Sequence, residues 1–255
     1  MSAAHPSRLD YGRGAKQHSC NGAAVDGCLA HCVALRESLK NADDLLRHFG
    51  QSTPRFFERT SLPRRTIFRR GEPVGGIPII CSGWAATIAG PGDSHRQITS
   101  FLLPGDLVSG ALIFEDKLDV TVEAVNAVTY HNYNRAEFRA ALASGPNLFK
   151  SILKLWTEEN LQIGQLVVDF GQCSAAGRIA RLIMRLLERL ARRHMVKNGT
   201  FEFPLRRRHI AEYTALTPGH VSTVIGRLRD AGVIDLKDRS LTVRDLPALK
   251  RLSRT

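Results

Sequence analysis

The spacing of apolar residues divides the chain into a strand-rich part followed by a helix-rich part. Between residues 55 and 134, short apolar or β-branched runs are broken by turn signals such as GEP at residues 71–73 and PGD at residues 104–106. Runs of this length at a spacing of about 8 to 12 residues are typical of a small antiparallel barrel or sandwich. We therefore expect a β-roll over residues 55–134, inside a domain that spans residues 45–145.

A helical period replaces this alternation after residue 134. Asn134 to Ala141 fits a short helix, and Pro146 opens a longer helix because proline is favoured in the first turn. Seven positions of the longer helix follow the alternating three- and four-residue spacing of a two-stranded coiled coil, namely Phe149, Ile152, Trp156, Glu159, Ile163, Leu166 and Phe170. We expect residues 146–171 to be a dimerisation helix, although packing on the chain's own β-roll would produce the same stripe. Glu159 is the polar member of that stripe and would act as a register device or a weak point.

Residues 174–194 form a second amphipathic pattern with one apolar face and one face rich in arginine. The arginines are Arg178, Arg181, Arg185, Arg189, Arg192 and Arg193. We expect this basic face either to be solvated or to lie beside a phosphate backbone.

Charge is distributed unevenly over the 255 residues. Residues 1–170 contain 18 Lys and Arg against 17 Asp and Glu, whereas residues 171–255 contain 18 against 7, so nearly all of the net charge of +12 lies in the last third. Clustered basic residues gain affinity for a polyanion by displacing counterions from its phosphates. The distribution favours a nucleic-acid-binding module over a basic face kept only for solubility.

Composition narrows the cellular setting. The chain is 43% hydrophobic, which is enough to bury one large core or two ordinary ones. No apolar run approaches the roughly 18 residues that span a bilayer, and residues 1–27 lack the layout of a secretory signal. Five cysteines, an odd number, do not suggest a disulfide framework. We expect a cytoplasmic protein with no membrane partner, whose flexible residues 1–44 carry reduced thiols or metal ligands.

The segment from Leu205 to Val243 has the pattern of a helix-turn-helix followed by a wing. A first helix with an apolar face ends at the turn Ala215-Leu216, after which Thr217 is a good N-cap and Pro218 a natural first residue. The second helix buries one face and leaves the following residues pointing elsewhere: His220, Ser222, Thr223, Arg227 and Arg229. A helix-turn-helix needs this division, because the exposed N-terminal residues of its second helix reach base edges in the major groove. The run VIDLKDRSLTV predicts a two-stranded wing with Lys237 and Arg239 at its tip.

With these motifs the chain resembles the Crp/Fnr family of bacterial transcription regulators over roughly residues 45–252. The resemblance is carried by ITSFLLPGD (residues 98–106), SGWA (82–85), PNL (146–148), the arginine-rich helix before FEFPL, and LTPGHVSTVIGRLRDAGVI (216–234). It implies an α+β chain with an N-terminal antiparallel β-roll like the jelly roll of cyclic-nucleotide-binding domains. A long dimerisation helix and a C-terminal winged helix-turn-helix in residues 172–255 complete the expected fold.

The resemblance also assigns roles to individual positions. Arg207 and Arg208 match residues that hold the DNA backbone, and Thr217 matches a further phosphate contact. The base-reading face maps to Pro218, Gly219, His220, Ser222 and Thr223, with Arg227 further along the helix and Lys237 and Arg239 on the wing. Gly219 and Thr223 stand where the family commonly has Glu and Arg, so the usual half-site is not expected. His220 remains the best candidate for a base contact, although it would also suit a phosphate contact.

The effector is less determined by the sequence. The stretch that holds the cyclic-nucleotide phosphate in one branch of the family corresponds to residues 105–124, which contain no arginine. We therefore do not expect cAMP to bind. Another branch binds an iron-sulfur cluster through cysteines, and Cys20, Cys28, Cys32 and Cys81 are candidate ligands here, although their spacing differs from the family's. An iron-sulfur or thiol redox sensor thus remains an alternative.

These features predict a homodimeric DNA-binding transcription regulator rather than an enzyme. The expected partners are a palindromic operator in double-stranded DNA, a second copy of the chain, and RNA polymerase if the protein is an activator. A nucleoid-type binder without sequence preference is a remote alternative. Motifs for hydrolytic or nucleotide-binding catalysis are absent from the sequence.

Overall fold

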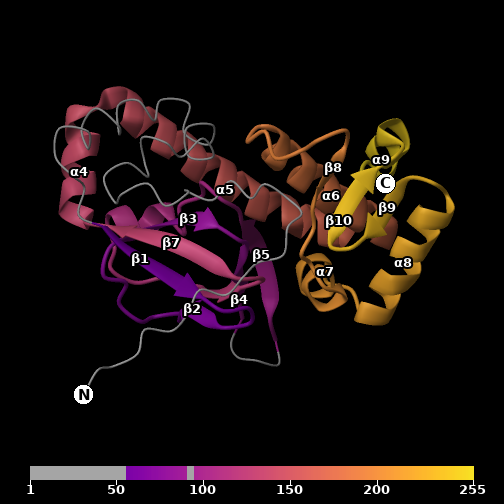
Figure 1. Ribbon diagram of the computed structural model, residues 1–255, viewed down its shortest axis with the longest axis horizontal. Coiled ribbons are helices and arrows are strands. Elements are labelled where there is room, and N and C mark those ends of the chain that lie inside the picture. The colour runs from indigo at the N-terminus through magenta and orange to yellow at the C-terminus, as the bar shows by residue number, and fades with distance from the viewer. Residues whose placement is uncertain (1–55, 91–94) are drawn as a thin grey trace, which may run out of the picture.

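The structure is a computed structural model in which residues 56–90 and 95–255 are described. In Figure 1 a β-rich N-terminal part, coloured indigo to magenta, is joined by a long helix to a C-terminal part coloured orange to yellow. This arrangement confirms the predicted α+β architecture of a β-roll, a connecting helix and a winged helix-turn-helix.

Two antiparallel sheets build the β-roll, one with strand order β1-β7-β3 and the other with order β2-β6-β4-β5. The strands are β1 (Phe56–Ser61), β2 (Thr66–Phe68), β3 (Ile77–Ser82), β4 (Ala85–Ala89), β5 (Gln97–Leu102), β6 (Thr121–Ala124) and β7 (Val128–Tyr133), with a single 3-10 turn η1 (Gly110–Ile113) between β5 and β6. Apolar side chains on the inner faces, such as Ile80, Leu102 and Val122, fill the roll. The strand alternation seen in the sequence therefore corresponds to one buried and one more exposed face.

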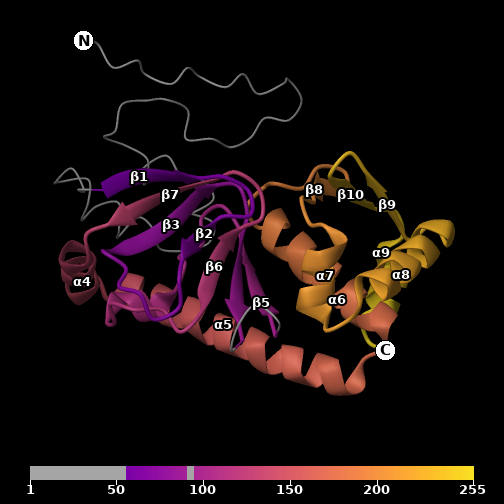
Figure 2. The same cartoon turned by 90° about the horizontal axis from the view of Figure 1, so that it is seen from below.

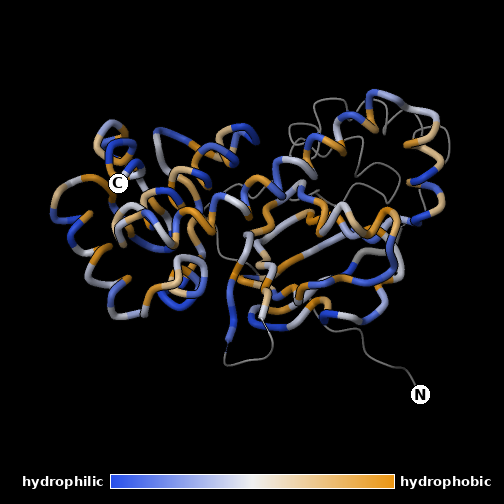
Figure 3. Tube along the Cα trace, turned by 180° about the vertical axis from the view of Figure 1, so that it is seen from behind, coloured by the Kyte–Doolittle hydropathy of each residue, from blue (hydrophilic) through white to orange (hydrophobic). Residues whose placement is uncertain are grey.

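Helices α4 (Arg135–Ser144) and α5 (Pro146–Gln172) follow directly. The side chain of Asn134 starts α4 by accepting a hydrogen bond from the backbone N–H of Ala136 at 2.8 Å. Phe138 of α4 and Leu148 of α5 pack with Ile79 of β3 in a second apolar cluster. In Figure 3 both helices alternate between polar and apolar segments, as amphipathic helices do. No helix within the described ranges is both long and apolar enough to cross a membrane.

The C-terminal domain combines four helices with a small sheet of order β8-β10-β9. Its elements are α6 (Ala175–Ala191), β8 (Thr200–Glu202), α7 (Arg207–Thr214), α8 (Pro218–Asp230), β9 (Ile234–Lys237), β10 (Ser240–Val243) and α9 (Leu246–Leu252). Asp238 and Arg239 join β9 to β10 with φ of +48° and +61°. Two consecutive left-handed residues are what a two-residue hairpin turn requires, so these strands form the predicted wing.

The two domains share an apolar core. Residues of β4 and β5 in the β-roll belong to the same buried cluster as residues of α6, α7 and α8. At its centre the ring of Phe101 stacks on the ring of Tyr213 with centroids 5.3 Å apart. The β-roll is thus packed directly against the first helix of the helix-turn-helix.

Candidate nucleic-acid interface

The helix-turn-helix is held by a sharp turn between α7 and α8. Ala215 ends α7 in the left-handed conformation, with φ of +53°, and the N–H of Leu216 reaches back to the carbonyl of Ala211 at 3.1 Å. Ile210 of α7 and Val221 of α8 are both fully buried where the two helices pack. The buried and exposed faces of α8 are therefore divided as the sequence predicts.

The N-terminal turn of α8 faces solvent. Thr217 caps the helix because its hydroxyl accepts a hydrogen bond from the N–H of His220 at 3.2 Å, which leaves the hydroxyl proton available to a phosphate. All the predicted base-reading residues are exposed, namely Pro218, Gly219, His220, Ser222 and Thr223. The hydroxyls of Ser222 and Thr223 donate to the carbonyls of Pro218 and Gly219 at 3.0 and 3.2 Å. They must rotate before they can donate to a base, whereas the side chain of His220 makes no hydrogen bond within the described part of the chain.

A pair of like charges lies beside this turn. Burial, and then the neighbouring Arg229, lower the pKa of Arg207. A DNA phosphate bound between the two guanidinium groups would relieve their mutual repulsion. Arg229 therefore joins Arg207 as a candidate contact to the DNA backbone. The sequence placed Arg229 away from the buried face but gave it no role. Arg208, Arg227, Lys237 and Arg239 are also exposed, on α7, α8 and the wing.

His209 anchors the first turn of α7 in its neutral form. Its Nδ1 accepts a hydrogen bond from the backbone N–H of Arg206 at 3.1 Å, and its ring is buried. Burial, followed by the positive charge of Arg208, lowers the pKa of His209 to about 4. In the folded protein His209 therefore stays neutral at mildly acidic pH, and it takes up a proton there only when α7 unfolds.

The contribution of His209 to the stability of the protein should accordingly fall as the pH drops. Because the pKa of His209 lies below the unfolded value of 6.5, the stabilisation is complete above pH 6.5 and is lost toward pH 4. We expect His209 to account for a loss of about 2–3 kcal/mol in the free energy of unfolding between pH 7 and pH 4. Urea titrations of the wild type and of His209→Asn, which keeps an acceptor but cannot be protonated, measure it as the difference between the two pH dependences. Equal slopes for both proteins would contradict this role.

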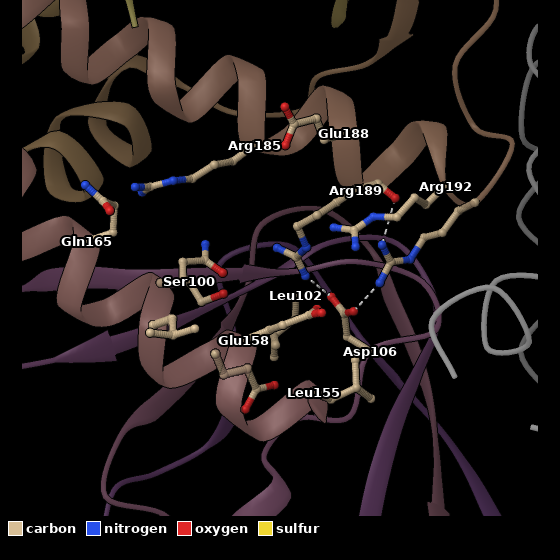
Figure 4. Close-up of a pocket in the computed structure, with 14 residues that line it drawn as sticks. Ser100, Leu102, Asp106, Leu155, Glu158, Gln165, Arg185, Glu188, Arg189 and Arg192 are labelled. Atoms are coloured by element: carbon tan, nitrogen blue, oxygen red, sulfur yellow. Dashed lines mark hydrogen bonds and ion pairs between the residues drawn. The ribbon is translucent and has the colours of Figure 1, made fainter. Parts of the chain in front are cut away.

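The connection between the β-roll and the C-terminal domain is ionic as well as apolar. The carboxylate of Asp106 pairs with Arg189 of α6 (Figure 4) and with the buried Arg193, which lies two residues beyond the end of α6. The same carboxylate accepts the N–H of Leu103 at 2.7 Å, which holds the PGD turn. Gln97 of β5 donates to the carbonyl of Glu212 in α7 at 2.5 Å. The turn and strand of the β-roll thus fix the position of α6 and α7.

The elbow between α5 and α6 has a similar arrangement. Asp169 is 2% exposed and pairs with Arg181 at 2.5 Å and with Arg185 at 2.8 Å. Arg185 also donates to the hydroxyl of Tyr213 at 2.9 Å, and Arg178 donates to the carbonyl of Phe170 at 2.8 Å. The arginine face of α6 was expected to be solvated or beside DNA. The structure corrects this for all but Arg192, which is exposed, because the other five arginines bind carboxylates and carbonyls inside the protein.

A cavity of about 380 Å³ lies between α5, α6 and β5. Figure 4 shows Arg189 and Asp106 on one side of it and Glu158 on another. Glu159 lines it too, and burial, followed by Asp106, raises the pKa of Glu159 to about 7. Glu159 therefore lies toward this cavity rather than in an exposed stripe of α5.

The exposed stripe of α5 agrees with the predicted stripe at every second position. At the positions between, it is shifted by one residue toward the C-terminus. Phe149, Trp156 and Ile163 are exposed as expected, at 47%, 51% and 48%. Ile152 and Leu166 are instead buried in the chain's own core, and Phe170 is partly buried against it. The exposed neighbours that complete the stripe are Leu153, Asn160 and Val167. The stripe available to a second copy is therefore Phe149, Leu153, Trp156, Asn160, Ile163 and Val167.

The β-roll offers poor conditions for a cyclic nucleotide. The hollow between α5 and the turn η1 has a volume of about 20 Å³, whereas small-molecule sites usually measure several hundred. Its lining includes the carboxylates of Asp106 and Glu159, and Trp156 covers Gly110 of η1. Both the size and the charge of this hollow disfavour a bound phosphate.

The structure describes one of the four candidate metal ligands. Cys20, Cys28 and Cys32 lie outside the described residues. Cys81 is buried in β3, where its thiol donates to the carbonyl of Ile79 at 3.7 Å. Residues 56–90 and 95–255 contain no group of three His, Cys, Asp or Glu side chains placed to hold a metal ion.

Two family models match this architecture. The model described as cyclic nucleotide-binding domain matches residues 58–144, and the model described as Crp-like helix-turn-helix domain matches residues 177–252. Together they account for more than half of the chain, in the order expected from the sequence.

Similar proteins agree with these matches. The chain is 27% identical to the nitrogen fixation regulation protein FixK of Bradyrhizobium diazoefficiens over 91% of its own length and 95% of that protein. It is 26% identical to the anaerobic regulatory protein of Pasteurella multocida over 75% and 70% of the two chains. The structure of FixK2 from Bradyrhizobium japonicum shares the fold, with a TM-score of 0.68 at 21% identity over 78% of this chain and 97% of that one. The chain therefore belongs to the Crp/Fnr family of DNA-binding transcription regulators.

Proposed function

We propose that this regulator binds a palindromic operator as a homodimer, with α8 of each protomer in the major groove of one half-site. The exposed N-terminal turn of α8, capped by Thr217 and flanked by Arg207 and Arg208, carries the proposal. An intact recognition helix favours sequence-specific binding over nucleoid-type binding. The protein acts in the cytoplasm, catalyses no reaction, and contacts RNA polymerase where it activates transcription.

The exposed stripe of α5 supports the homodimer. Its residues are spaced alternately by four and three, as in a two-stranded coiled coil, and most of them are large and apolar. Burying such a stripe against its copy removes apolar surface from water without using residues that the chain's own core needs. A two-fold axis along α5 then presents two copies of α8 to one face of the DNA.

The signal acts on the β-roll or on the N-terminal segment, and it reaches α6 through Asp106. The small volume and the acidic lining of the hollow beside η1 disfavour a cyclic nucleotide as that signal. The redox alternative depends on Cys20, Cys28 and Cys32. Protein purified without oxygen would contain iron and sulfide, and would lose its colour in Cys28→Ser and Cys32→Ser variants, if these residues bind a cluster. Colourless, iron-free protein would rule the cluster out and leave thiol oxidation to be tested.

Selection of bound sequences from a random DNA pool tests operator binding. The proposal expects enrichment of inverted repeats whose half-site centres are about one helical turn, roughly 10 bp, apart. Enrichment of no shared sequence, with equal affinity for all duplexes, would instead support nucleoid-type binding.

His220 should contribute to the base preference. Because its side chain is exposed and forms no hydrogen bond with the described residues, we expect His220→Ala to cost about 1–3 kcal/mol on the selected operator and to relax the preference at one position of each half-site. Competition binding against operators substituted at single positions measures this. Lys250→Ala, on the exposed surface of α9, serves as the control and should bind like the wild type. If His220→Ala weakened binding to all sequences equally, His220 would be a phosphate contact.

A further inference from the structure

Two exposed side chains of α8 already use their hydrogen-bond donors inside the helix. The hydroxyl of Ser222 donates to the carbonyl of Pro218 at 3.0 Å, and the hydroxyl of Thr223 donates to the carbonyl of Gly219 at 3.2 Å. Serine and threonine commonly form such bonds to the carbonyl four residues earlier. The methyl group of Thr223 is therefore the part of these two side chains that a base edge can contact without breaking a hydrogen bond of the protein.

The helix around Thr223 has little bulk on the same face. Gly219 lies four residues before Thr223 and Gly226 three residues after it, and residues at these spacings share one face of a helix. A side-chain carbon on either glycine would meet no neighbouring atom within 4 Å, so the packing of the protein does not require glycine there. Glycine is also less favourable in a helix than alanine or leucine. The two glycines lower the stability of α8 and leave room for a close approach from outside.

This face of α8 points away from the rest of the protein. Val221, Ile225 and Leu228, on the opposite side of the helix, are buried. In Figure 2 α7 lies between the β-roll and α8, so the β-roll does not cover the exposed face of α8. The major groove is wide enough to admit a helix, and α8 can enter it with Thr223 facing the bases.

We propose that Thr223 recognises a thymine in each half-site through contact between its methyl group and the C5-methyl group of the base. The proposal rests on the operator binding proposed above and adds a second base-reading position to that of His220. Apolar contact with the thymine methyl group distinguishes one base pair from the others in the major groove and needs no free hydrogen-bond donor. Gly219 allows α8 to approach closely enough for the two methyl groups to touch.

Uracil substitution in the operator tests the proposal, because uracil differs from thymine only in lacking the methyl group. The probe is the duplex enriched from the random pool, with each thymine of a half-site replaced in turn by uracil. We expect one of these replacements to weaken binding of the wild-type protein about fourfold, and the same replacement in both half-sites to weaken it about tenfold or more. At that position 5-methylcytosine should support tighter binding than cytosine, since it restores the methyl group alone.

Two substitutions separate the methyl group of Thr223 from its hydroxyl. T223S removes the methyl group and should bind the thymine and uracil operators equally, whereas T223V keeps a methyl group without the hydroxyl and should discriminate like the wild type. T157S is the matched control, because Thr157 is an exposed threonine of α5 whose hydroxyl donates to the carbonyl of Leu153 at 2.8 Å. It should also discriminate like the wild type. Gly219→Leu, which the open space accommodates, should lower operator affinity about tenfold or more.

Equal affinity of the wild type for the thymine and uracil operators would overturn the proposal, as would selected half-sites without an invariant thymine. Discrimination that is lost in T223V and kept in T223S would overturn it as well, and would assign the base reading to the hydroxyl. Wild-type affinity in Gly219→Leu would show that α8 does not approach the bases along this face, which is also incompatible with the proposal. Enrichment of no sequence by the wild type is a different result, which would refute the operator binding itself.

Discussion

Replacing Asp106 with alanine is expected to lower the free energy of unfolding by about 3–5 kcal/mol, because the substitution leaves buried positive charge without a partner. Arg193 is buried and pairs with Asp106, while Arg189 shares the same carboxylate. Burial already lowers the pKa of Arg193, and Asp106 counteracts this shift. Urea denaturation at neutral pH measures the loss. The variant should also bind the operator less tightly, since the PGD turn no longer fixes α6.

The double variant D106A/R193M separates this cause from a general defect. Removing both partners deletes the buried charge together with its counterion, so its destabilisation should be smaller than the sum of the two single effects. Asp116→Ala, at an exposed position of the β-roll, should change stability by less than about 0.5 kcal/mol. A loss below about 1 kcal/mol for Asp106→Ala would place the pair among ordinary surface ion pairs.

Replacing Ile163 with aspartate should convert the dimer into monomers and reduce operator affinity by about 100-fold or more. Ile163 is 48% exposed on the stripe of α5, and in a two-fold dimer each copy would face its counterpart. Two carboxylates in an apolar seam repel each other and lose their hydration. Sedimentation equilibrium and operator titration measure the two effects together.

Leu161→Asp is a demanding control for this experiment. Leu161 is more exposed than Ile163 and lies two residues away on the same helix, but on a different face. It should leave the molecular mass and the operator affinity unchanged. Dimers in both variants would mean that α5 does not form the interface, and monomers in both would mean that the seam has been assigned to the wrong face.

Local sequence signals were sufficient for the fold and for the recognition helix. Turn residues and strand alternation located the β-roll, and Thr217 followed by Pro218 located the start of α8, because caps and turns depend on neighbours in the sequence. The exposed side of α8 followed from its period of 3.6 residues. The family resemblance then gave these elements their roles.

Contacts between distant residues were not predictable in this way. Asp106 lies 83 and 87 residues from its two arginine partners, and no spacing rule links a turn of the β-roll to arginines at and just beyond the end of α6. The stripe of α5 was ambiguous for a different reason. Both Ile152 and Leu153 are apolar, as are Leu166 and Val167, so only the packing of α5 on the β-roll decides which of each pair remains outside.

Asn160 occupies the middle of the exposed stripe, where every other position is apolar. In the proposed dimer two asparagine side chains meet there, and they satisfy each other only when the two helices are parallel and aligned. The same polar pair lowers the stability of the dimer relative to a fully apolar seam. The fraction of the protein that is dimeric then depends on its concentration in the cell. While the operator is mostly free, its occupancy rises with the square of the monomer concentration. The regulator's own abundance thereby becomes an input to its target genes.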